Sequence, residues 1–291
     1  MIDAVDYVIY GDTDSLFYSV ETFIEKHVGL DKWNSINIES KITFCKRIAN
    51  IVSEYVNSKA YNTIQRKDFN SQRKDFKIVF EQEIIASTGL WVDKKRYGLG
   101  IVDKDGIRKD ELFIRGLEII QSLTPIAIKH RLKNMLQLIL SGAADSAISK
   151  AIKTDKKELL LSHPNEIAVN VAAKNLDKYI VNGKAIKGTP WTLKGINNYH
   201  KIIESLSLTT KYERIGSVGD KVRVVYIKEP NMYNIDIMGF MRWPEEVKVA
   251  GVEIDYDKMI EKYYTNKIQH LLDPINKGGL IYGGDIGSFF R

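Results

Sequence analysis

The chain of 291 residues has one cysteine, six prolines and no long hydrophobic run, and each shortage excludes a class of protein. The lone cysteine, Cys45, excludes an internal disulfide framework and any zinc site built from several cysteines. The prolines and the 20 glycines are too few for collagen-like or low-complexity sequence. No apolar run approaches the roughly 20 residues that a helix needs to span a bilayer. We therefore expect a globular protein of a reducing compartment, the cytoplasm, with no membrane partner.

Basic residues exceed acidic ones, with 43 Lys and Arg against 37 Asp and Glu, which gives a formal charge of +6 and a pI near 9.0. This excess is compatible with a polyanionic partner but does not identify one. Hydrophobic residues make up 44% of the chain and charged residues 27%, which is typical of a folded protein with a core. The length suffices for one large domain or two of ordinary size.

The first part of the chain mixes strand and helix patterns. Residues 5–20 carry β-branched and aromatic residues on either side of Gly-Asp-Thr-Asp, which predicts a hairpin. Apolar residues at helical spacing predict a helix over residues 38–64. The run 76–86 predicts a strand, and Lys-Asp-Gly at 104–106 predicts the turn of a second hairpin.

After Gly116 the pattern becomes mostly helical. Thr124 followed by Pro125 predicts an N-cap and a proline at the first helical position, and an apolar stripe continues from there to about residue 141. Further helices are expected over 144–161, 165–178, 191–205 and 255–272, with a β-like patch at 222–228. We therefore predict an α+β fold with a boundary near 115–120 and no internal repeat.

Residues 10–15, Tyr-Gly-Asp-Thr-Asp-Ser, are the most informative segment. In a strand, residues i and i+2 point to the same face, so Asp12 and Asp14 can present two carboxylates together at a hairpin tip. Two like charges this close repel one another unless a cation compensates them, and Mg²⁺ commonly takes one or two carboxylates together with substrate phosphates. The alternative for Asp-x-Asp alone is a solvated turn, because Asp and Gly favour turns.

The whole hexapeptide resembles motif C of the family B, or polymerase-α-like, DNA polymerases. Residues 94–97, Lys-Lys-Arg-Tyr, resemble a motif that follows motif C in the same family, and Glu83 lies at the position of a strand glutamate shortly before it. The chain is most similar to the T-even-type bacteriophage branch. Residues 116–118 and 122–125 resemble its palm-to-thumb transition, and segments within 167–199 resemble its thumb, so that the resemblance covers nearly the whole chain.

The resemblance implies the C-terminal part of a polymerase palm over residues 1–117 and a mostly helical thumb with a C-terminal tail over residues 118–291. It implies that Asp14 is the principal ligand of two Mg²⁺ ions, which it bridges together with a partner aspartate. Asp12 would be the supporting carboxylate, and Glu83 would help to place the site.

The same resemblance implies contacts with primer-template DNA. Lys95 and Tyr97 would hold the primer strand near its 3′ end, while Lys94 and Arg96 would supply charge, because phosphate contacts position a duplex without reading its sequence. The alternative for the three basic residues is a solvated turn. The thumb residues that we expect to contact phosphate are Lys174, Lys187 and Lys194.

A family B polymerase needs parts that these 291 residues do not contain: the motif A aspartate, the fingers helix of motif B that binds the deoxynucleoside triphosphate, and the proofreading exonuclease. We therefore expect the chain alone to bind primer-template weakly and to catalyse nothing. We predict a naturally split polymerase of a phage, in the cytoplasm of the host cell, whose partner polypeptide carries the missing parts. The alternative is an engineered or truncated fragment.

The C-terminal residues Ile286, Phe289 and Phe290 resemble the sliding-clamp-binding peptide of replicative polymerases, although Gly283 stands where that peptide has glutamine. They predict a sliding clamp as a further partner, with docking onto the thumb as the alternative. A second hypothesis for the whole chain is a non-catalytic DNA-binding or clamp-tethering protein. Both hypotheses predict DNA affinity that falls with salt, but only the first predicts Mg²⁺-dependent synthesis.

Other residues indicate no further chemistry. The five histidines show no metal-ligand spacing, and His130 and His200 are expected at the surface or at helix ends. Neither Ser15 nor Cys45 has a recognisable catalytic partner, so nucleophilic catalysis is not supported.

Overall fold

The computed structural model describes residues 7–12, 14–60, 79–216 and 219–282. The chain divides into two compact units. The first comprises Met1–Gly89 and Leu99–Phe113, and the second comprises Leu90–Gly98 and Ile114–Arg291. Among the helices of the described ranges, none has both the length and the apolar character that crossing a membrane requires. The fold is a mixed α+β fold, as the sequence predicts.

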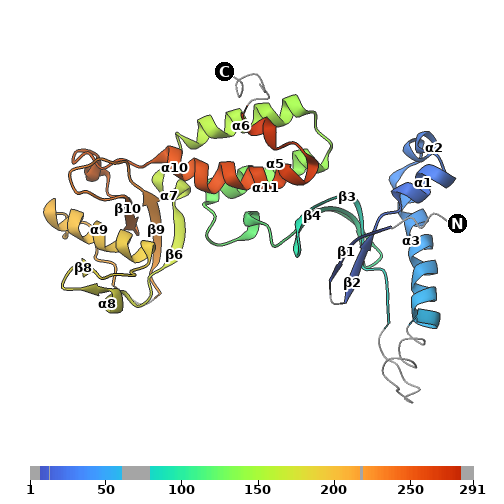
Figure 1. Cartoon of the computed structure of the whole chain (residues 1–291), viewed down its shortest axis with the longest axis horizontal. Helices are drawn as coiled ribbons and strands as arrows, with labels where there is room; N and C mark the ends of the chain where they lie inside the picture. The colour runs from blue at the N-terminus through green and yellow to red at the C-terminus, as the bar shows by residue number, and fades with distance from the viewer. Residues whose placement is uncertain (1–6, 13, 61–78, 217–218, 283–291) are drawn as a thin grey trace, which may run out of the picture. The chain divides into compact units, whose positions relative to one another are not determined.

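The first unit begins with the predicted hairpin, formed by β1 (Val8–Asp12) and β2 (Ser15–Tyr18), which are antiparallel (Figure 1). Tyr10 lies opposite Phe17, and their rings are 6.1 Å apart. Aromatic pairs across two strands stabilise an antiparallel ladder. The register shifts between Val8 and Tyr10, so the strand bends shortly before its carboxylate-bearing end.

Three helices follow the hairpin: α1 (Glu21–His27), α2 (Leu30–Ser35) and α3 (Ile38–Tyr55), the last continued by the π-helical turn η1 (Val56–Ala60). The Asn37 side chain caps α3 by accepting a hydrogen bond of 2.9 Å from the Ser40 N–H. The buried face of α3 contains Ile42 and Ala49, two turns apart. The predicted helix is confirmed over residues 38–60, and its last part, 61–64, lies outside the described residues.

A sheet of three long strands follows, in the order β3 (Ile84–Asp93), β4 (Arg96–Lys104) and β5 (Ile107–Arg115). The predicted hairpin turn is confirmed, since Asp105 and Gly106 have φ of 50° and 80°, the left-handed values that a two-residue hairpin turn requires. The predicted strand 76–86 is wrong over residues 79–83, because β3 begins only at Ile84. The division between the units crosses this sheet, with residues 90–98 in the second unit.

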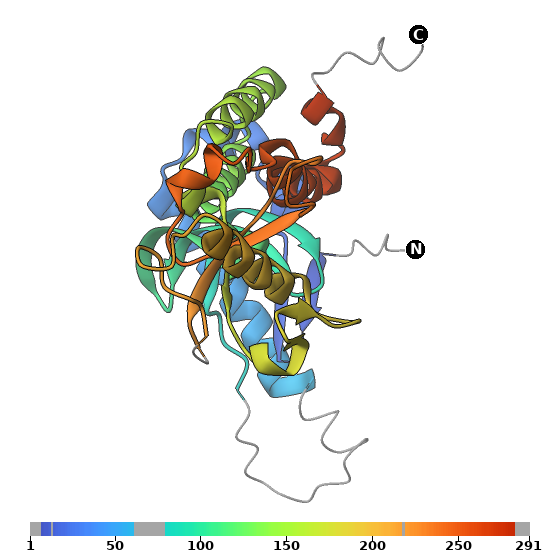
Figure 2. The same cartoon turned by 90° about the vertical axis from the view of Figure 1, so that its left-hand side faces the viewer.

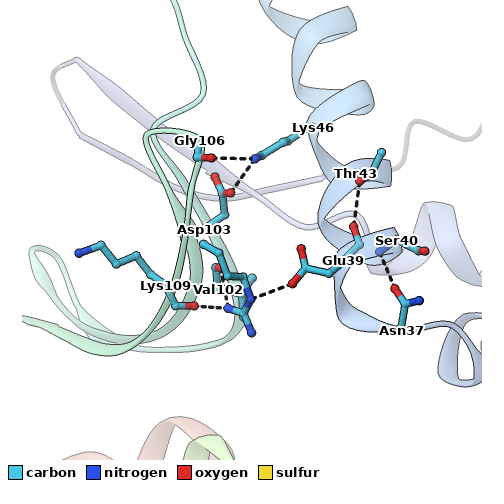
Figure 3. A network of polar contacts seen from close by, with 10 residues as sticks. Asn37, Glu39, Ser40, Thr43, Lys46, Val102, Asp103, Gly106 and Lys109 are labelled. Atoms are coloured by element: carbon cyan, nitrogen blue, oxygen red, sulfur yellow. Dashed lines mark hydrogen bonds and ion pairs between the residues drawn. The ribbon is translucent and has the colours of Figure 1, made fainter.

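Polar contacts join α3 to the β4–β5 turn inside the first unit (Figure 3). Lys46 Nζ lies 2.6 Å from Asp103 Oδ2, and the Asp103 side chain is only 2% exposed. Arg108 Nε lies 3.2 Å from Glu39 Oε1, and Arg108 Nη1 donates to the Val102 carbonyl at 2.7 Å. A buried carboxylate is costly without a partner, so Lys46 holds the helix and the turn together.

The helical part of the second unit contains α5 (Ile126–Leu140), α6 (Asp145–Leu159), α10 (Tyr256–Ile260) and α11 (Asn266–Leu272), the last two joined by the π-helical turn η4 (Glu261–Thr265). The predicted helices 144–161 and 255–272 are thereby confirmed. The predicted cap at Thr124 is wrong, because Pro125 is the N-cap residue of α5. The buried Thr124 hydroxyl instead donates to the Glu118 carbonyl at 2.7 Å.

The second unit also contains an antiparallel sheet in the order β10 (Ile237–Phe240), β9 (Lys221–Tyr226) and β6 (Val169–Ala172). Helix α9 (Trp191–Ser205), predicted from the sequence over the same residues, lies across β9 and β10 (Figure 2). The predicted helix 165–178 is wrong, since β6 occupies its middle. Every residue of β10 is buried, so the sheet and α9 form the core of this part.

Short elements connect these parts. They are η2 (Glu118–Ile120), α7 (Pro164–Ile167), α8 (Leu176–Tyr179), β7 (Ile180–Val181), β8 (Lys184–Ala185), η3 (Glu245–Lys248), η5 (Asp273–Ile275) and η6 (Gly278–Tyr282). Strands β7 and β8 form a two-stranded hairpin that precedes α9. Helices α7 and α8 flank β6 along the chain.

Candidate functional site

The tip of the β1–β2 hairpin carries the two candidate carboxylates. Asp12 is the last residue of β1 and pairs with Ser15, the first residue of β2. Asp14 lies in the turn between the strands and is exposed, whereas Asp12 is half-buried. Asp14 therefore belongs to the turn and not to a strand. The two carboxylates share one end of the hairpin because the turn follows β1 directly, and not because alternate residues of a strand point to the same face.

Two carboxylates at one hairpin tip fit Mg²⁺ by the chemistry of their oxygens, because this ion commonly takes one or two protein carboxylates and completes its shell with water and phosphate oxygens. Across the residues that the structure describes, no three histidine, cysteine, aspartate or glutamate side chains form a group that could hold a metal ion. Glu83 accordingly does not join Asp12 and Asp14 in such a group.

Glu83 immediately precedes β3, and its side chain is exposed. Its carbonyl accepts a hydrogen bond of 2.8 Å from the Asp105 N–H in the β4–β5 turn. This bond fixes the beginning of β3 against the sheet within the first unit. The Glu83 backbone is thus held at the β4–β5 turn, while the Glu83 side chain is exposed to solvent.

The basic motif at residues 94–97 comprises the turn between β3 and β4 and the first two residues of β4, and we call it the basic turn. Lys94 and Lys95 occupy the turn itself and are exposed. The Lys94 N–H donates to Asp93 Oδ1 at 2.7 Å. Lys95 has φ of 60°, the left-handed conformation, which costs a side chain larger than hydrogen about 1 kcal/mol or more. A strained lysine in an exposed turn is a reason to look for function there.

The other two residues of the basic turn point into the second unit. Tyr97 is 4% exposed, and its ring stacks on that of Trp91 at 6.1 Å. Arg96 Nη2 lies 2.6 Å from Glu118 Oε1. The motif therefore divides into two exposed lysines at the turn and two inward residues that hold the turn in place.

The buried Glu118 is the centre of an electrostatic cluster. Besides Arg96, its Oε1 lies 3.3 Å from Lys267 Nζ and 3.6 Å from His270 Nδ1, both on α11. Burial alone would raise the pKa of Glu118, but a backbone hydrogen bond and Arg96 outweigh burial and lower the pKa below its usual value. Glu118 therefore stays ionised and links the basic turn to α11.

Gly116 provides a second contact behind the basic turn. It has φ of 68°, and a Cβ atom on it would lie 2.1 Å from the Lys95 carbonyl oxygen. Only glycine fits this position, for both its conformation and its space. In the sequence, residues 116–118 support only a resemblance. Their role could not be read from the sequence, because Glu118 meets partners 22 and 149 residues away along the chain.

The three thumb candidates lie on different elements of the second unit. Lys174 follows β6, Lys187 lies between β8 and α9, and Lys194 lies in the first turns of α9. All three side chains are exposed. The candidate clamp-binding residues Ile286, Phe289 and Phe290 lie outside the described residues.

No family model matches the chain. Among curated proteins, the DNA-directed DNA polymerase of Escherichia phage RB69 is 27% identical over 281 residues, which cover 90% of this chain and 30% of that protein. The DNA-directed DNA polymerase of Enterobacteria phage T4 is 25% identical over 277 residues, with the same two coverages. The chain thus spans about 30% of the length of the relatives it matches, and it has a distant similarity to part of these family B DNA polymerases.

Proposed function

We propose that this chain supplies the motif C carboxylates and the DNA-binding thumb of a family B DNA-directed DNA polymerase. The observation that carries the proposal is the similarity to two such polymerases over 90% of the chain. The hairpin with Asp12 and Asp14 at its tip supports it. The chain corresponds to 30% of those proteins. A partner polypeptide would supply the motif A aspartate, the fingers and the exonuclease.

In this proposal Asp12 and Asp14 hold Mg²⁺ through their carboxylate oxygens. The ions, when bound, would neutralise charge on the transferred phosphoryl group and on the attacking and leaving oxygens. The chain's own contribution is to present two anionic groups at the end of the β1–β2 hairpin. Asp14 is exposed in the turn, so the primer end and a nucleotide can approach it.

The basic turn would contact the primer strand. Lys94 and Lys95 are exposed and carry the charge that phosphate contacts require. Arg96 and Tyr97 would orient these lysines, because the Glu118 ion pair and the Trp91 stack hold them in place. The thumb lysines and the clamp-binding tail remain proposals from the sequence: Lys174, Lys187, Lys194, Ile286, Phe289 and Phe290.

The test is primer extension with Mg²⁺ and the four deoxynucleoside triphosphates. This chain, a polypeptide that carries the exonuclease, motif A and fingers of the same polymerase, and their mixture are assayed side by side. We expect synthesis only in the mixture. Asp14→Ala in the mixture should abolish synthesis, while Asp110→Ala, at an exposed acid on β5, should leave it unchanged.

Two outcomes would contradict the proposal. Synthesis by this chain alone would mean that the active site does not depend on a separate motif A aspartate. Salt-sensitive DNA binding without synthesis in any mixture would favour the non-catalytic DNA-binding or clamp-tethering function. Purification of the mixture by size before the assay shows whether the two polypeptides associate, and so separates failed assembly from failed chemistry.

A further inference from the structure

One face of α6 carries only lysine and hydroxyl side chains. Six positions recur at steps of three and one residues, which keeps them on one face of a helix. These positions line a shallow surface depression, and we call them the α6 stripe: Ser146, Ser149, Lys150, Lys153, Thr154 and Lys157. The stripe has no carboxylate, no aromatic ring and no aliphatic side chain.

The packing of α6 fixes the direction in which the stripe points. Ile148, Ile152 and Leu159 are each at most 1% exposed and attach the opposite face of the helix to the core of the second unit. Rotation of α6 about its axis would expose these three residues, which costs roughly 1.5–3 kcal/mol for each. The lysines of the stripe are exposed as a consequence.

The acidic residues of α6 all have partners away from the stripe. Asp155 Oδ2 accepts a hydrogen bond of 2.6 Å from the Tyr264 hydroxyl, and Arg131 lies within ion-pair distance of both Asp155 and Glu158. Asp145, at the beginning of the helix, lies 2.7 Å from Lys277 Nζ. Each of these acids therefore already has a partner outside the stripe.

The lysines of the stripe are left with uncompensated charge. Within the described residues, Lys150, Lys153 and Lys157 make no ion pair, so three positive charges lie along two turns of one exposed helix face. Lysines three and four positions apart on a helix are neighbours, with Cβ atoms about 5–6 Å apart. The surface is a row of cationic hydrogen-bond donors.

The chemistry of the row favours phosphate over protein. Ammonium and hydroxyl groups both donate hydrogen bonds, and phosphodiester oxygens accept them along a strand of evenly spaced charges. A protein partner would need buried aromatic or apolar anchors, and protein interfaces are depleted in lysine. We propose that the α6 stripe binds the sugar-phosphate backbone of nucleic acid, which rests on the proposed function in that α6 belongs to the proposed DNA-binding thumb. The stripe would be a contact additional to the hairpin tip, the basic turn and the three thumb lysines named above.

The test measures binding of a fluorescently labelled DNA duplex to the full chain by anisotropy over a series of KCl concentrations. We expect K150Q/K153Q/K157Q to weaken binding about tenfold at low salt. We also expect it to reduce the slope of log K against log salt by up to about 2.7, since each lost phosphate contact removes about 0.9. No primer extension is read, so the result does not depend on the proposed polymerase activity.

Matched variants separate charge from folding. K150R/K153R/K157R keeps the charge and should bind like the wild type. Lys156→Gln changes a half-buried lysine of the same helix outside the stripe, and it should bind more tightly than Lys153→Gln. Wild-type affinity and slope in the triple glutamine variant would overturn the proposal, as would salt-independent binding or no binding by the wild type. Loss of binding to an acidic polypeptide, with DNA binding intact, would overturn it in favour of a protein partner.

Discussion

The presence of a lysine at position 95 is explained better by function than by stability. Seven non-glycine residues of the described chain have positive φ, and four of them are asparagines, which tolerate this conformation. Lys95 is the basic residue among them, in an exposed turn backed by Gly116. A lysine at this position lowers the free energy of unfolding by about 1 kcal/mol. A contact between its side chain and phosphate would explain why lysine occurs here despite this cost.

Lys95→Asn should therefore separate stability from binding. We expect the free energy of unfolding to stay the same or rise by up to about 1 kcal/mol, because asparagine adopts the left-handed conformation more readily. Affinity for primer-template should fall, with a smaller salt slope, since one phosphate contact is lost. Urea denaturation and anisotropy titration measure the two effects. Unchanged DNA affinity would leave Lys95 as a turn residue only.

At His200 the structure differs from the expectation drawn from the sequence. The expectation of a position at the surface or at a helix end is wrong, because His200 lies inside α9 and is 7% exposed. Its Nε2 accepts a hydrogen bond of 3.0 Å from the Ile215 N–H. Burial, with a smaller effect from Arg214, lowers the pKa of His200 from 6.5 to about 4. The imidazole is therefore neutral in the folded protein at neutral pH.

This shift predicts a stability that depends on pH. Between pH 6.5 and about 4 the unfolded chain binds a proton at His200 and the folded chain does not, so stability falls as the pH falls through this range. The loss is of the order of 3 kcal/mol. Urea denaturation of wild type and His200→Gln at several pH values measures it, and the variant should show a flatter dependence. Equal pH dependence in both proteins would contradict the assignment.

At the scale of elements, two glycines allow α9 to approach β10 closely. A Cβ atom on Gly195 of α9 would lie 3.0 Å from the Gly239 backbone nitrogen, and one on Gly239 would lie 3.0 Å from the Ile196 nitrogen. Backbone atoms on both sides leave no flexible side chain to move away. The helix and the strand therefore pack with backbone against backbone.

The Gly195→Ala variant tests this contact, because the contact determines whether the substitution raises or lowers stability. In a free helix the change would stabilise by about 1 kcal/mol, because alanine favours helix and glycine does not. Here we expect a net destabilisation of about 1–3 kcal/mol, since the added methyl group forces α9 away from β10. Gly279→Ala is the control, because a Cβ there meets nothing within 4 Å. A stabilised Gly195→Ala variant in thermal denaturation would show that the contact is loose.

Elements with a strong local pattern could be predicted, and those defined by distant partners could not. The turn at Asp105-Gly106 and the helix 191–205 carry their own signals and are confirmed. Residues 169–172 have a pattern that suits a helix or a strand. They form β6 because Val169 and its neighbours pair with β9, about 50 residues further along the chain. The local periodicity of residues 169–172 does not predict that pairing.

The candidate site follows the same rule. The hairpin tip could be predicted because both carboxylates lie within three residues of one another in a turn pattern. Glu118 could not, because it acquires its role from Arg96, Lys267 and His270, which come together only in the folded second unit. Its partners are far apart in sequence and have no shared motif.

For the whole molecule, the two compact units carry different parts of the proposed machinery. Asp12, Asp14 and Glu83 belong to the first unit, whereas the basic turn and Glu118 belong to the second. In the proposal the first unit presents acidic groups for metal ions, and the second presents basic groups for DNA. The similarity to polymerases extends over both units, since it covers 90% of the chain.

The most direct test asks whether the hairpin tip belongs to the active site. It measures the rate of single-nucleotide incorporation by the mixture of this chain and its proposed partner polypeptide. The rate is measured at saturating Mg²⁺, DNA and nucleotide for the wild type, Asp14→Asn and Asp110→Asn. We predict that Asp14→Asn lowers the rate by at least about a thousandfold, about 4 kcal/mol of barrier, while Asp110→Asn leaves it unchanged. An Asp14→Asn rate within a few-fold of the wild type would contradict the assignment of the hairpin tip to the active site.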